Sequence, residues 1–396
     1  MNIFNSLGSN YNLQYVISSL FSGNDKNSNV KLKEFLEKKY DGKVTLLYKG
    51  REAIRLSLRA MNLPEGSIVA INGFTCFAVY KAIVDEGLKV KYLDVDDREL
   101  NFSANTLKNA LKNFKIKAVI IQNTLGNPCD IDAIQKICKE RNIVLIEDLA
   151  HSIGTKYKNG REAGTIGDFV VLSFSQDKMV DGVSGGALVI RDKKVQRYTG
   201  AKVQDLTKKK QIVDRLYPLF TFLIRNLYGL KIGKILHAFL KKVHLLSLPM
   251  DGGEVLHGLP DKHAQLALDG LKNLDMNLEH RKKIASVYIR MLDPKILFYS
   301  TKEQISNSNN LRFPVIVEKR ENLIRNLKSF GIYISDIWYD APVAPKKYLK
   351  LTDYINQCPN AESISEKIVN LPTHINITDG DARKIADKIN IWLKPQ

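Results

Sequence analysis

The chain has 396 residues, of which 44% are hydrophobic and 26% are charged, a composition typical of a globular protein with two or three domains. Its four cysteines are scattered, with neither a CxxC pair nor zinc-ligand spacing, which argues against a disulfide framework or a metal site and favours a reducing cytoplasm. The formal net charge of +18 admits nucleic acid, anionic lipid or phosphorylated substrates as partners, and charge does not choose among them.

The first 28 residues lack the basic start and the continuous apolar run of a signal peptide. A membrane-spanning helix needs roughly 18–20 apolar residues, and no stretch of the sequence reaches that length. The longest candidate, residues 216–224, is interrupted by Arg225. We therefore expect a cytoplasmic protein.

From about residue 44 to residue 190, short apolar runs alternate with helical patterns. The runs are rich in Val, Ile and Leu and mostly lack strict alternation, which indicates strands buried on both faces. Repeated strand–helix units predict an α/β fold whose mainly parallel sheet lies between helices and binds ligands at the carboxyl ends of its strands. The predicted strands are 44–48, 67–71, 89–95, 117–123, 143–148, 169–174 and 186–192, and helices are expected at 51–62, 76–86, 103–113 and 132–141. Asp132 is the predicted N-cap of the last helix.

The segment 193–256 departs from this rhythm and is typical of basic helices with apolar faces. Between Lys193 and Lys242 it holds thirteen Lys and Arg but only two acids, Asp205 and Asp214. A single amphipathic helix is expected at 264–288, followed by a smaller α+β unit with a strand at 311–317 and helices at 322–330, 363–368 and 379–392. We therefore expect a large domain at 1–256, which includes the basic segment, and a small domain at 257–396.

Chemically useful side chains follow the ends of two neighbouring predicted strands. Asp148 ends one strand, with His151 three residues later, and Ser173 and Lys178 follow the next strand, before a glycine-rich turn at 181–186. Taken singly, each is more often a capping, solvated or structural residue than a functional one. Together at one sheet edge, they suit pyridoxal phosphate (PLP). This cofactor needs a lysine amine for a covalent bond, a carboxylate beside its pyridine nitrogen, and donors around its phosphate.

In this assignment Lys178 supplies the amine and Asp148 the carboxylate. Ser173 and the turn at 49–52, which enters a helix, supply the phosphate donors.

The stretch from Glu147 to Val189 resembles the DegT/StrS family of sugar aminotransferases, which are fold-type I PLP enzymes, and the resemblance extends over nearly the whole chain. Further similar segments are 48–96, 123–134, 260–288 and 358–389. The residues that carry the central match are Glu147, Asp148, Ala150, His151, Gly164, Gly167, Asp168, Ser173, Phe174, Lys178, Gly185 and Gly186.

The resemblance implies a three-layer PLP-transferase fold and a homodimer whose active sites use both subunits. It implies that Lys178 forms the Schiff base and moves the proton, and that Asp148 pairs with the pyridinium. His151 is expected near the ring, whereas Ser173, Gly50 and Arg51 are expected at the phosphate. The implied reaction moves an amino group from glutamate to a keto-sugar on a nucleoside diphosphate, in surface polysaccharide or glycan biosynthesis.

Three positions depart from the family pattern. Cys76 stands where an aromatic residue usually stacks on the ring, so either Phe77 takes over or stacking is weaker. Gly258 stands where the partner subunit often supplies an Asn to the phosphate, and Arg51 is a possible substitute. Met179 replaces a frequent Asn. Relatives that carry out dehydration have His instead of the lysine, so Lys178 argues against that branch.

Other functions stay open at this point. A non-catalytic regulator or scaffold with this fold, or a PLP-dependent sugar dehydratase, are the alternatives to an aminotransferase. The basic segment is interpreted first as helices that pack on a dimer or cover the site. The second interpretation is a peripheral contact of residues 193–244 with anionic lipid. Nucleic acid is disfavoured because no recognised binding motif is present. The loops expected to select the sugar lie near 181–183, 251–260 and 336–348.

Overall fold

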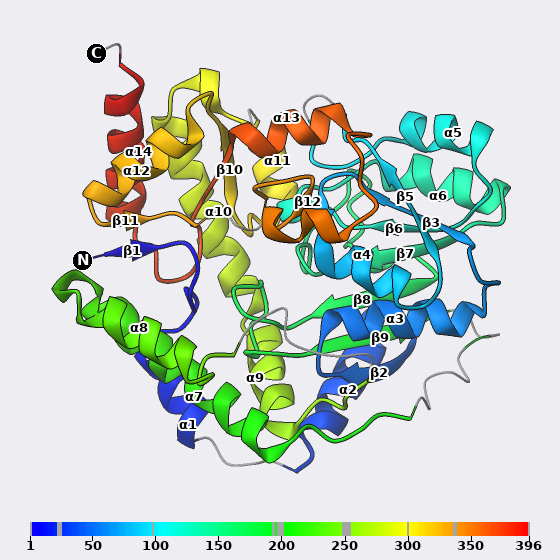
Figure 1. Cartoon of the computed structure of the whole chain (residues 1–396), viewed down its shortest axis with the longest axis horizontal. Coiled ribbons are helices and arrows are strands. Elements are labelled where there is room, and N and C mark those ends of the chain that lie inside the picture. Colours follow the sequence, from blue (N-terminus) through cyan, green and yellow to red (C-terminus); the bar gives the residue numbers. More distant parts are fainter. Residues whose placement is uncertain are drawn as a thin grey trace.

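The computed structural model describes residues 2–21, 26–96, 99–191, 195, 202–247, 255–298, 301–335 and 339–394. A seven-stranded sheet in the order β2-β9-β8-β7-β6-β3-β5 forms its centre, with helices on both faces (Figure 1). Every neighbouring pair is parallel except the two pairs made by β9, which is antiparallel to β2 and β8. The strands are β2 (Lys43–Leu47), β3 (Ile68–Asn72), β5 (Lys89–Leu93), β6 (Ile116–Ile121), β7 (Val144–Asp148), β8 (Phe169–Ser173) and β9 (Gly186–Ile190).

All seven predicted strands are therefore present, and the predicted fold class is confirmed. Every residue of β8 and β9 is buried, which explains why their sequences show no alternation of apolar and polar residues. Two large apolar clusters cover the two faces of the sheet. The helices that belong to this part of the chain are α2 (Ser28–Tyr40), α3 (Gly50–Met61), α4 (Phe77–Val84), α5 (Ala104–Asn113) and α6 (Ile131–Glu140), with the short helix η1 at Thr124–Gly126.

The predicted N-cap of α6 was wrong by two residues. The N-cap is Asp130, whose side chain accepts a hydrogen bond from the backbone N–H of Ala133 at 3.3 Å. Asp132 lies in the first turn instead, where a negative charge is favourable near the helix start, and it forms a 2.6 Å ion pair with Arg161.

The predicted helix at 264–288 is two helices, α9 (Asp261–Lys272) and α10 (Leu274–Met291), separated at Asn273. The two halves bury their apolar faces in different places. Leu268 and Leu271 of α9 pack into a cluster on the sheet, whereas the buried apolar residues from Ile284 onward in α10, such as Tyr288, pack into the core of the C-terminal part. The apolar periodicity continues across the break, so the sequence pattern did not reveal it. The division into domains at 256/257 stays a prediction.

The C-terminal part is a small α+β unit, as expected. The N-terminal strand β1 (Ile3–Phe4) pairs with its strand β11 (Ile332–Tyr333), so the start of the chain is joined to the C-terminal part there. The pairs β10 (Phe313–Ile316) with β13 (Ile368–Leu371) and β4 (Thr75–Cys76) with β12 (Val343–Ala344) are also formed. The remaining elements are η4 (Pro294–Ile296), α11 (Lys302–Asn307), α12 (Arg320–Ser329), η5 (Lys346–Leu351), α13 (Pro359–Lys367) and α14 (Asp379–Leu393).

The basic segment is helical, as predicted, over residues 208–242, whereas the described residues 202–207 are not helical and form a bridge from Gln204 to His257. Helices α7 (Lys208–Leu227) and α8 (Ile232–Lys242), joined by η3 (Tyr228–Leu230), lie beside α1 (Leu13–Phe21) at one corner of the molecule, away from the sheet (Figure 1). Among the described helices, none combines the length and the apolar character that crossing a membrane requires.

Candidate active site

A cavity of about 700 Å³ opens at the carboxyl ends of β7 and β8. Its wall brings together seven of the eight predicted site residues; Phe77 is not among its lining residues. Those seven are Gly50, Arg51, Cys76, Asp148, His151, Ser173 and Lys178. Segments far apart in the sequence therefore converge where the sheet topology predicted that a ligand would bind.

Lys178 lies in the loop between β8 and β9, and the N-terminal segment holds this loop in place. The Asp177 carboxylate accepts hydrogen bonds from the backbone N–H of Leu7 at 3.1 Å and of Ser9 at 2.8 Å, and from the Ser9 hydroxyl at 2.7 Å. The Asn10 amide donates to the Lys178 carbonyl at 3.0 Å. Burial lowers the pKa of the Lys178 amine, which makes the neutral, nucleophilic form easier to reach.

A second carboxylate, Asp181, closes the same loop. It accepts from the Asp177 backbone N–H at 2.7 Å, the Val183 N–H at 2.9 Å and the Tyr11 hydroxyl at 2.8 Å. Burial, and then the neighbouring charge of Asp177, raise the pKa of Asp181 to about 7. Local sequence patterns do not reveal the anchors in the N-terminal segment, because those partners lie more than 160 residues away along the chain.

Asp148 ends β7 with its side chain in the cavity wall and accepts a hydrogen bond from the Ala150 backbone N–H at 3.0 Å. Burial raises the pKa of this carboxyl to about 6, although the amide and the nearby Lys178 both act to lower it. A cationic ring nitrogen placed against Asp148 would favour the ionised carboxylate further.

His151 is held by Tyr339, a residue that the sequence analysis placed only in a substrate loop. The Tyr339 hydroxyl lies 2.9 Å from Nδ1 of His151 and accepts from the Gln122 amide at 2.9 Å. Burial, then the positive charges of Lys178 and Arg312, hold the pKa of His151 well below its usual range. The ring is therefore neutral, and its orientation is fixed by Tyr339.

The predicted phosphate side is built by close approach of the backbone. An added Cβ at Gly50 would lie 2.8 Å from the Cβ of Ser173, and one at Gly186 would lie 2.6 Å from the backbone of Lys49 and Gly50. Because Gly50 and Gly186 have no side chains, the start of α3 lies in close backbone contact with β8 and β9. A helix start together with a serine hydroxyl is a common phosphate site.

A second cavity of about 480 Å³ shares His151, Gln176 and Lys178 with the first. It is lined by Arg312, whose Nη2 donates to the Asn5 carbonyl at 2.5 Å, and by Tyr339. The sequence analysis did not predict Arg312. The only signal available was its position near the start of the predicted strand 311–317.

Phe77 is turned away from the site. It begins α4, packs in the apolar cluster on that face of the sheet, and stacks on Tyr348 with ring centroids 5.0 Å apart. Cys76, the last residue of β4, faces the cavity instead, and burial raises the pKa of its thiol. Of the two alternatives, that Phe77 takes over or that stacking is weaker, the packing of Phe77 favours the second, because the side chain at the cavity is the thiol of Cys76.

The other two positions that depart from the family pattern are Met179 and Gly258. Met179 is buried in the apolar cluster on the opposite face of the sheet, so it serves packing. Gly258 forms a bridge with Leu47 at the end of β2, and its backbone N–H donates to the Gln204 carbonyl at 3.0 Å.

Some motif residues form the scaffold rather than the cavity wall. The buried Glu147 carboxylate accepts from the Gly164 N–H at 2.8 Å and the Gly167 N–H at 2.6 Å. Glu147 thereby fixes the loop between β7 and β8. Asp168, in the same loop, accepts a hydrogen bond from the Leu145 backbone N–H at 2.8 Å.

The donor set fits PLP. One cavity holds a buried lysine, a buried aspartate at a strand end, a neutral histidine and a glycine–serine contact at a helix start. These are the groups that such a cofactor requires for covalent attachment, ring charge and phosphate binding. Fold and site together fit the class of α/β transferases whose chemistry uses such a cofactor.

Comparison with known proteins gives the family. A sequence profile of the DegT/DnrJ/EryC1/StrS aminotransferase family matches residues 26–212 and 257–390, so the chain belongs to this family. GDP-perosamine synthase of Escherichia coli O157:H7 is 24% identical over 363 residues, which cover 90% of this chain and 87% of that protein. A Campylobacter jejuni UDP-4-amino-4,6-dideoxy-N-acetyl-beta-L-altrosamine transaminase is 26% identical over 355 residues, covering 87% and 84%.

Among solved structures, a DegT DnrJ EryC1 StrS aminotransferase from Brucella abortus superposes with a TM-score of 0.74 at 20% identity, covering 96% of this chain and 97% of that one. The predicted family and the predicted enzyme class, an aminotransferase, are therefore both confirmed.

Proposed function

We propose that this aminotransferase uses PLP to move an amino group from glutamate to a keto-sugar carried by a nucleotide. The observation that carries the proposal is the meeting of Lys178, Asp148 and the Gly50–Ser173 contact in one cavity. The names of the relatives support the substrate class, because both are enzymes of nucleotide-linked sugars.

When bound, PLP supplies an aldehyde for the amine and a ring that accepts electrons from the substrate carbon. The remaining roles belong to residues of this chain. Lys178, whose pKa burial lowers, would hold the cofactor through its amine and would accept and return the transferred proton at Nζ. Asp148 would lie against the ring nitrogen and favour its protonated form, His151 would orient the ring, and Ser173, Gly50 and Arg51 would bind the phosphate.

The proposal includes a cytoplasmic homodimer, in line with the family resemblance. Of the three loops expected to select the sugar, part of 251–260 and part of 336–348 lie outside the described residues, whereas 181–183 is held by Asp181.

The test is the absorbance spectrum of the purified full chain with and without glutamate. We expect a band at about 410–430 nm that is lost when glutamate is added. Lys178→Ala and Lys178→Arg should both lack the band, and the Arg variant controls for loss of the positive charge. A wild-type protein that takes up no PLP contradicts the proposal. Bound PLP without turnover of any nucleotide-linked keto-sugar favours a non-catalytic regulator.

A further inference from the structure

Helix α8 presents an apolar stripe to solvent. Ile232, Ile235, Phe239 and Val243 follow one another at three- and four-residue spacing, which places them on one face. Their exposed fractions are 51%, 70%, 57% and 40%. Large apolar side chains this exposed, and gathered on one helix, mark an interaction surface more often than chance exposure does.

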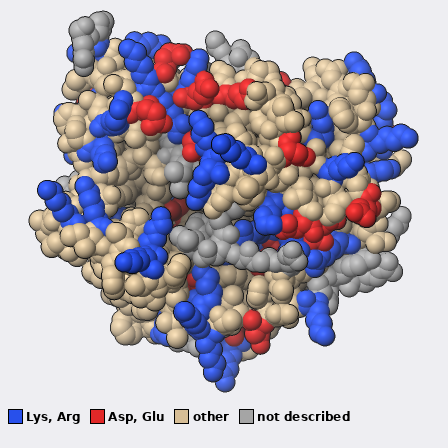
Figure 2. Space-filling model, in the orientation of Figure 1, with Lys and Arg blue, Asp and Glu red and all other residues tan. Residues whose placement is uncertain are grey.

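Lysines lie to one side of this stripe, Lys231 and Lys242 nearest to it and Lys234 and Lys241 farther round the helix, and acids are absent from its surroundings in sequence. Lys231, Lys234, Lys241 and Lys242 are all exposed, and no Asp or Glu occurs between Asp214 and Asp251. In Figure 2 blue side chains project from a largely tan surface where α8 lies in Figure 1. The face therefore combines apolar contact area with positive charge.

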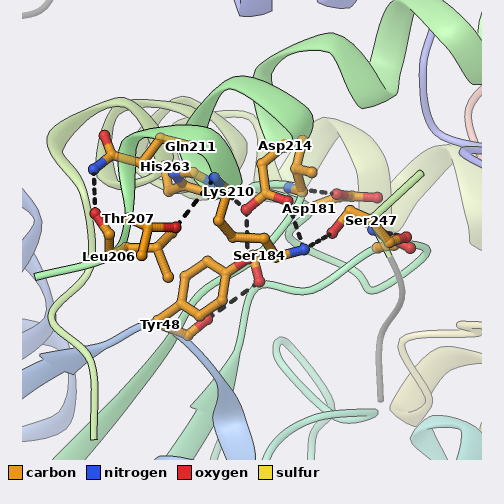
Figure 3. A network of polar contacts seen from close by, with 12 residues as sticks. Tyr48, Asp181, Ser184, Leu206, Thr207, Lys210, Gln211, Asp214, Ser247 and His263 are labelled. Atoms are coloured by element: carbon orange, nitrogen blue, oxygen red, sulfur yellow. Dashed lines mark hydrogen bonds and ion pairs between the residues drawn. The ribbon is translucent and has the colours of Figure 1, made fainter. Parts of the chain in front are cut away.

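The helix is held firmly in place. An added Cβ at Gly233 would lie 2.2 Å from the Ile224 carbonyl oxygen, so α8 packs against the end of α7 at backbone contact distance. Helix α7 is in turn fixed to the body by the buried Asp214, which contacts Tyr48, His263 and Lys210 (Figure 3). The family profile does not match residues 213–256, so most of the sequence of this hairpin lies outside the family pattern.

We propose that the outer face of α8, defined by the four apolar residues and four lysines above, docks on the surface of an anionic phospholipid bilayer. The apolar stripe enters the headgroup boundary, and the lysines remain among the phosphates. A second copy of the chain is a poorer occupant, because a symmetric contact would bring the same lysines against one another. Duplex nucleic acid would offer the apolar stripe no apolar partner.

The test is flotation of the full chain with phosphatidylcholine vesicles that contain about 30% phosphatidylglycerol, at low salt. We expect co-flotation that is lost at about 0.5 M salt, where surface charges are screened. Ile235→Asp and Phe239→Asp should each weaken binding by roughly tenfold or more. Ile391→Asp on α14 is the matched control, because Ile391 is as exposed as Phe239, at 57%. It should bind as wild type does.

The role of charge is tested separately. Lys241→Glu with Lys242→Glu should weaken vesicle binding by roughly tenfold or more. Lys108→Glu with Lys112→Glu changes the net charge equally but lies on α5, across the molecule (Figure 1), and should leave binding nearly unchanged.

Equal losses from both pairs, or no flotation of the wild type, would overturn the proposal. So would self-association that Phe239→Asp abolishes without any vesicle binding, or binding to random duplex alone. The readout needs no turnover, so it stands whether or not the aminotransferase proposal holds.

Discussion

The loop that carries Lys178 and the α7–α8 hairpin are each held by a buried carboxylate, but the two anchors differ in kind. Asp181 faces the carboxylate of Asp177, and burial and this neighbour raise its pKa to about 7. Burial would also raise the pKa of Asp214, but His263, Lys210 and Tyr48 outweigh it and hold that pKa well below the usual range. The hairpin is therefore fixed by an ionised carboxylate, whereas the catalytic loop is fixed by one that titrates near neutrality.

The regions also differ in what they share with relatives. The loop lies within the family profile and the hairpin mostly outside it. The chemistry common to the family is therefore expected of the buried loop, whereas the bilayer docking proposed above would depend on the hairpin's own sequence. Substitutions in the Lys178 loop should lower turnover more than the free energy of unfolding. Substitutions that remove the anchor of the α7–α8 hairpin should lower the free energy of unfolding more than turnover.

The largest effect is expected from Lys178→Ala. Loss of the amine removes both covalent attachment and proton transfer, so turnover should fall by at least about 10³-fold. The cofactor-free protein should not become less stable, because burial disfavours the charged form of this amine. Steady-state rates and urea unfolding measure the two effects. A variant that keeps more than a tenth of the activity would show that another group moves the proton.

The opposite pattern is expected from Asp214→Ala. Its side chain is fully buried and lies 3.2 Å from Nε2 of His263 and 3.2 Å from Nζ of Lys210. Removing one partner of a buried charge network costs about 3–5 kcal/mol of unfolding free energy. Denaturant unfolding measures it, with the exposed Asp205→Ala as control, for which the change should stay within about 0.5 kcal/mol. Comparable losses in both variants would show that the network does not anchor the hairpin.

A smaller effect with a defined pH dependence is expected from Asp148→Asn in the cofactor-free protein. The folded-state pKa of Asp148 is raised from 3.8 to about 6, so the wild type loses stability as pH rises from about 4 to 6. The Asn variant cannot ionise. It should equal the wild type below pH 4 and exceed it by up to about 3 kcal/mol above pH 6.

The measurement is unfolding free energy against pH, with Asp132→Asn as the exposed control. A gain at pH 7 that persists at pH 4 would mean that packing, and not ionisation, causes it. The same variant should hold PLP more weakly, because the partner of the ring nitrogen is lost.

The sequence predicted local patterns well and long-range contacts poorly. Seven strands followed from short apolar runs, and the strand ends at Asp148 and Ser173 placed both residues at the cavity. The contacts of Ser9 with Asp177 in the Lys178 loop and of Tyr339 with His151 join residues more than 160 positions apart, which no local pattern encodes. The break at Asn273 was missed for a related reason, since it depends on which core each half of the helix meets.

The smallest predicted effect concerns Phe77, which the sequence placed in the site and the structure places in the packing. Phe77→Leu should cost about 1 kcal/mol of unfolding free energy, because a similar volume is kept and the stacking on Tyr348 is lost. The PLP band and the affinity for the cofactor should not change. Cys76→Ser, at the neighbouring position that lines the cavity, is the matched variant and should shift the band or the affinity while changing stability less. If Phe77→Leu alone perturbs the band, the Phe77 ring faces the cofactor in the PLP-bound protein, and α4 must then rotate when PLP binds. If neither variant perturbs it, ring contact at this edge of the site comes from a residue outside the β4–α4 junction.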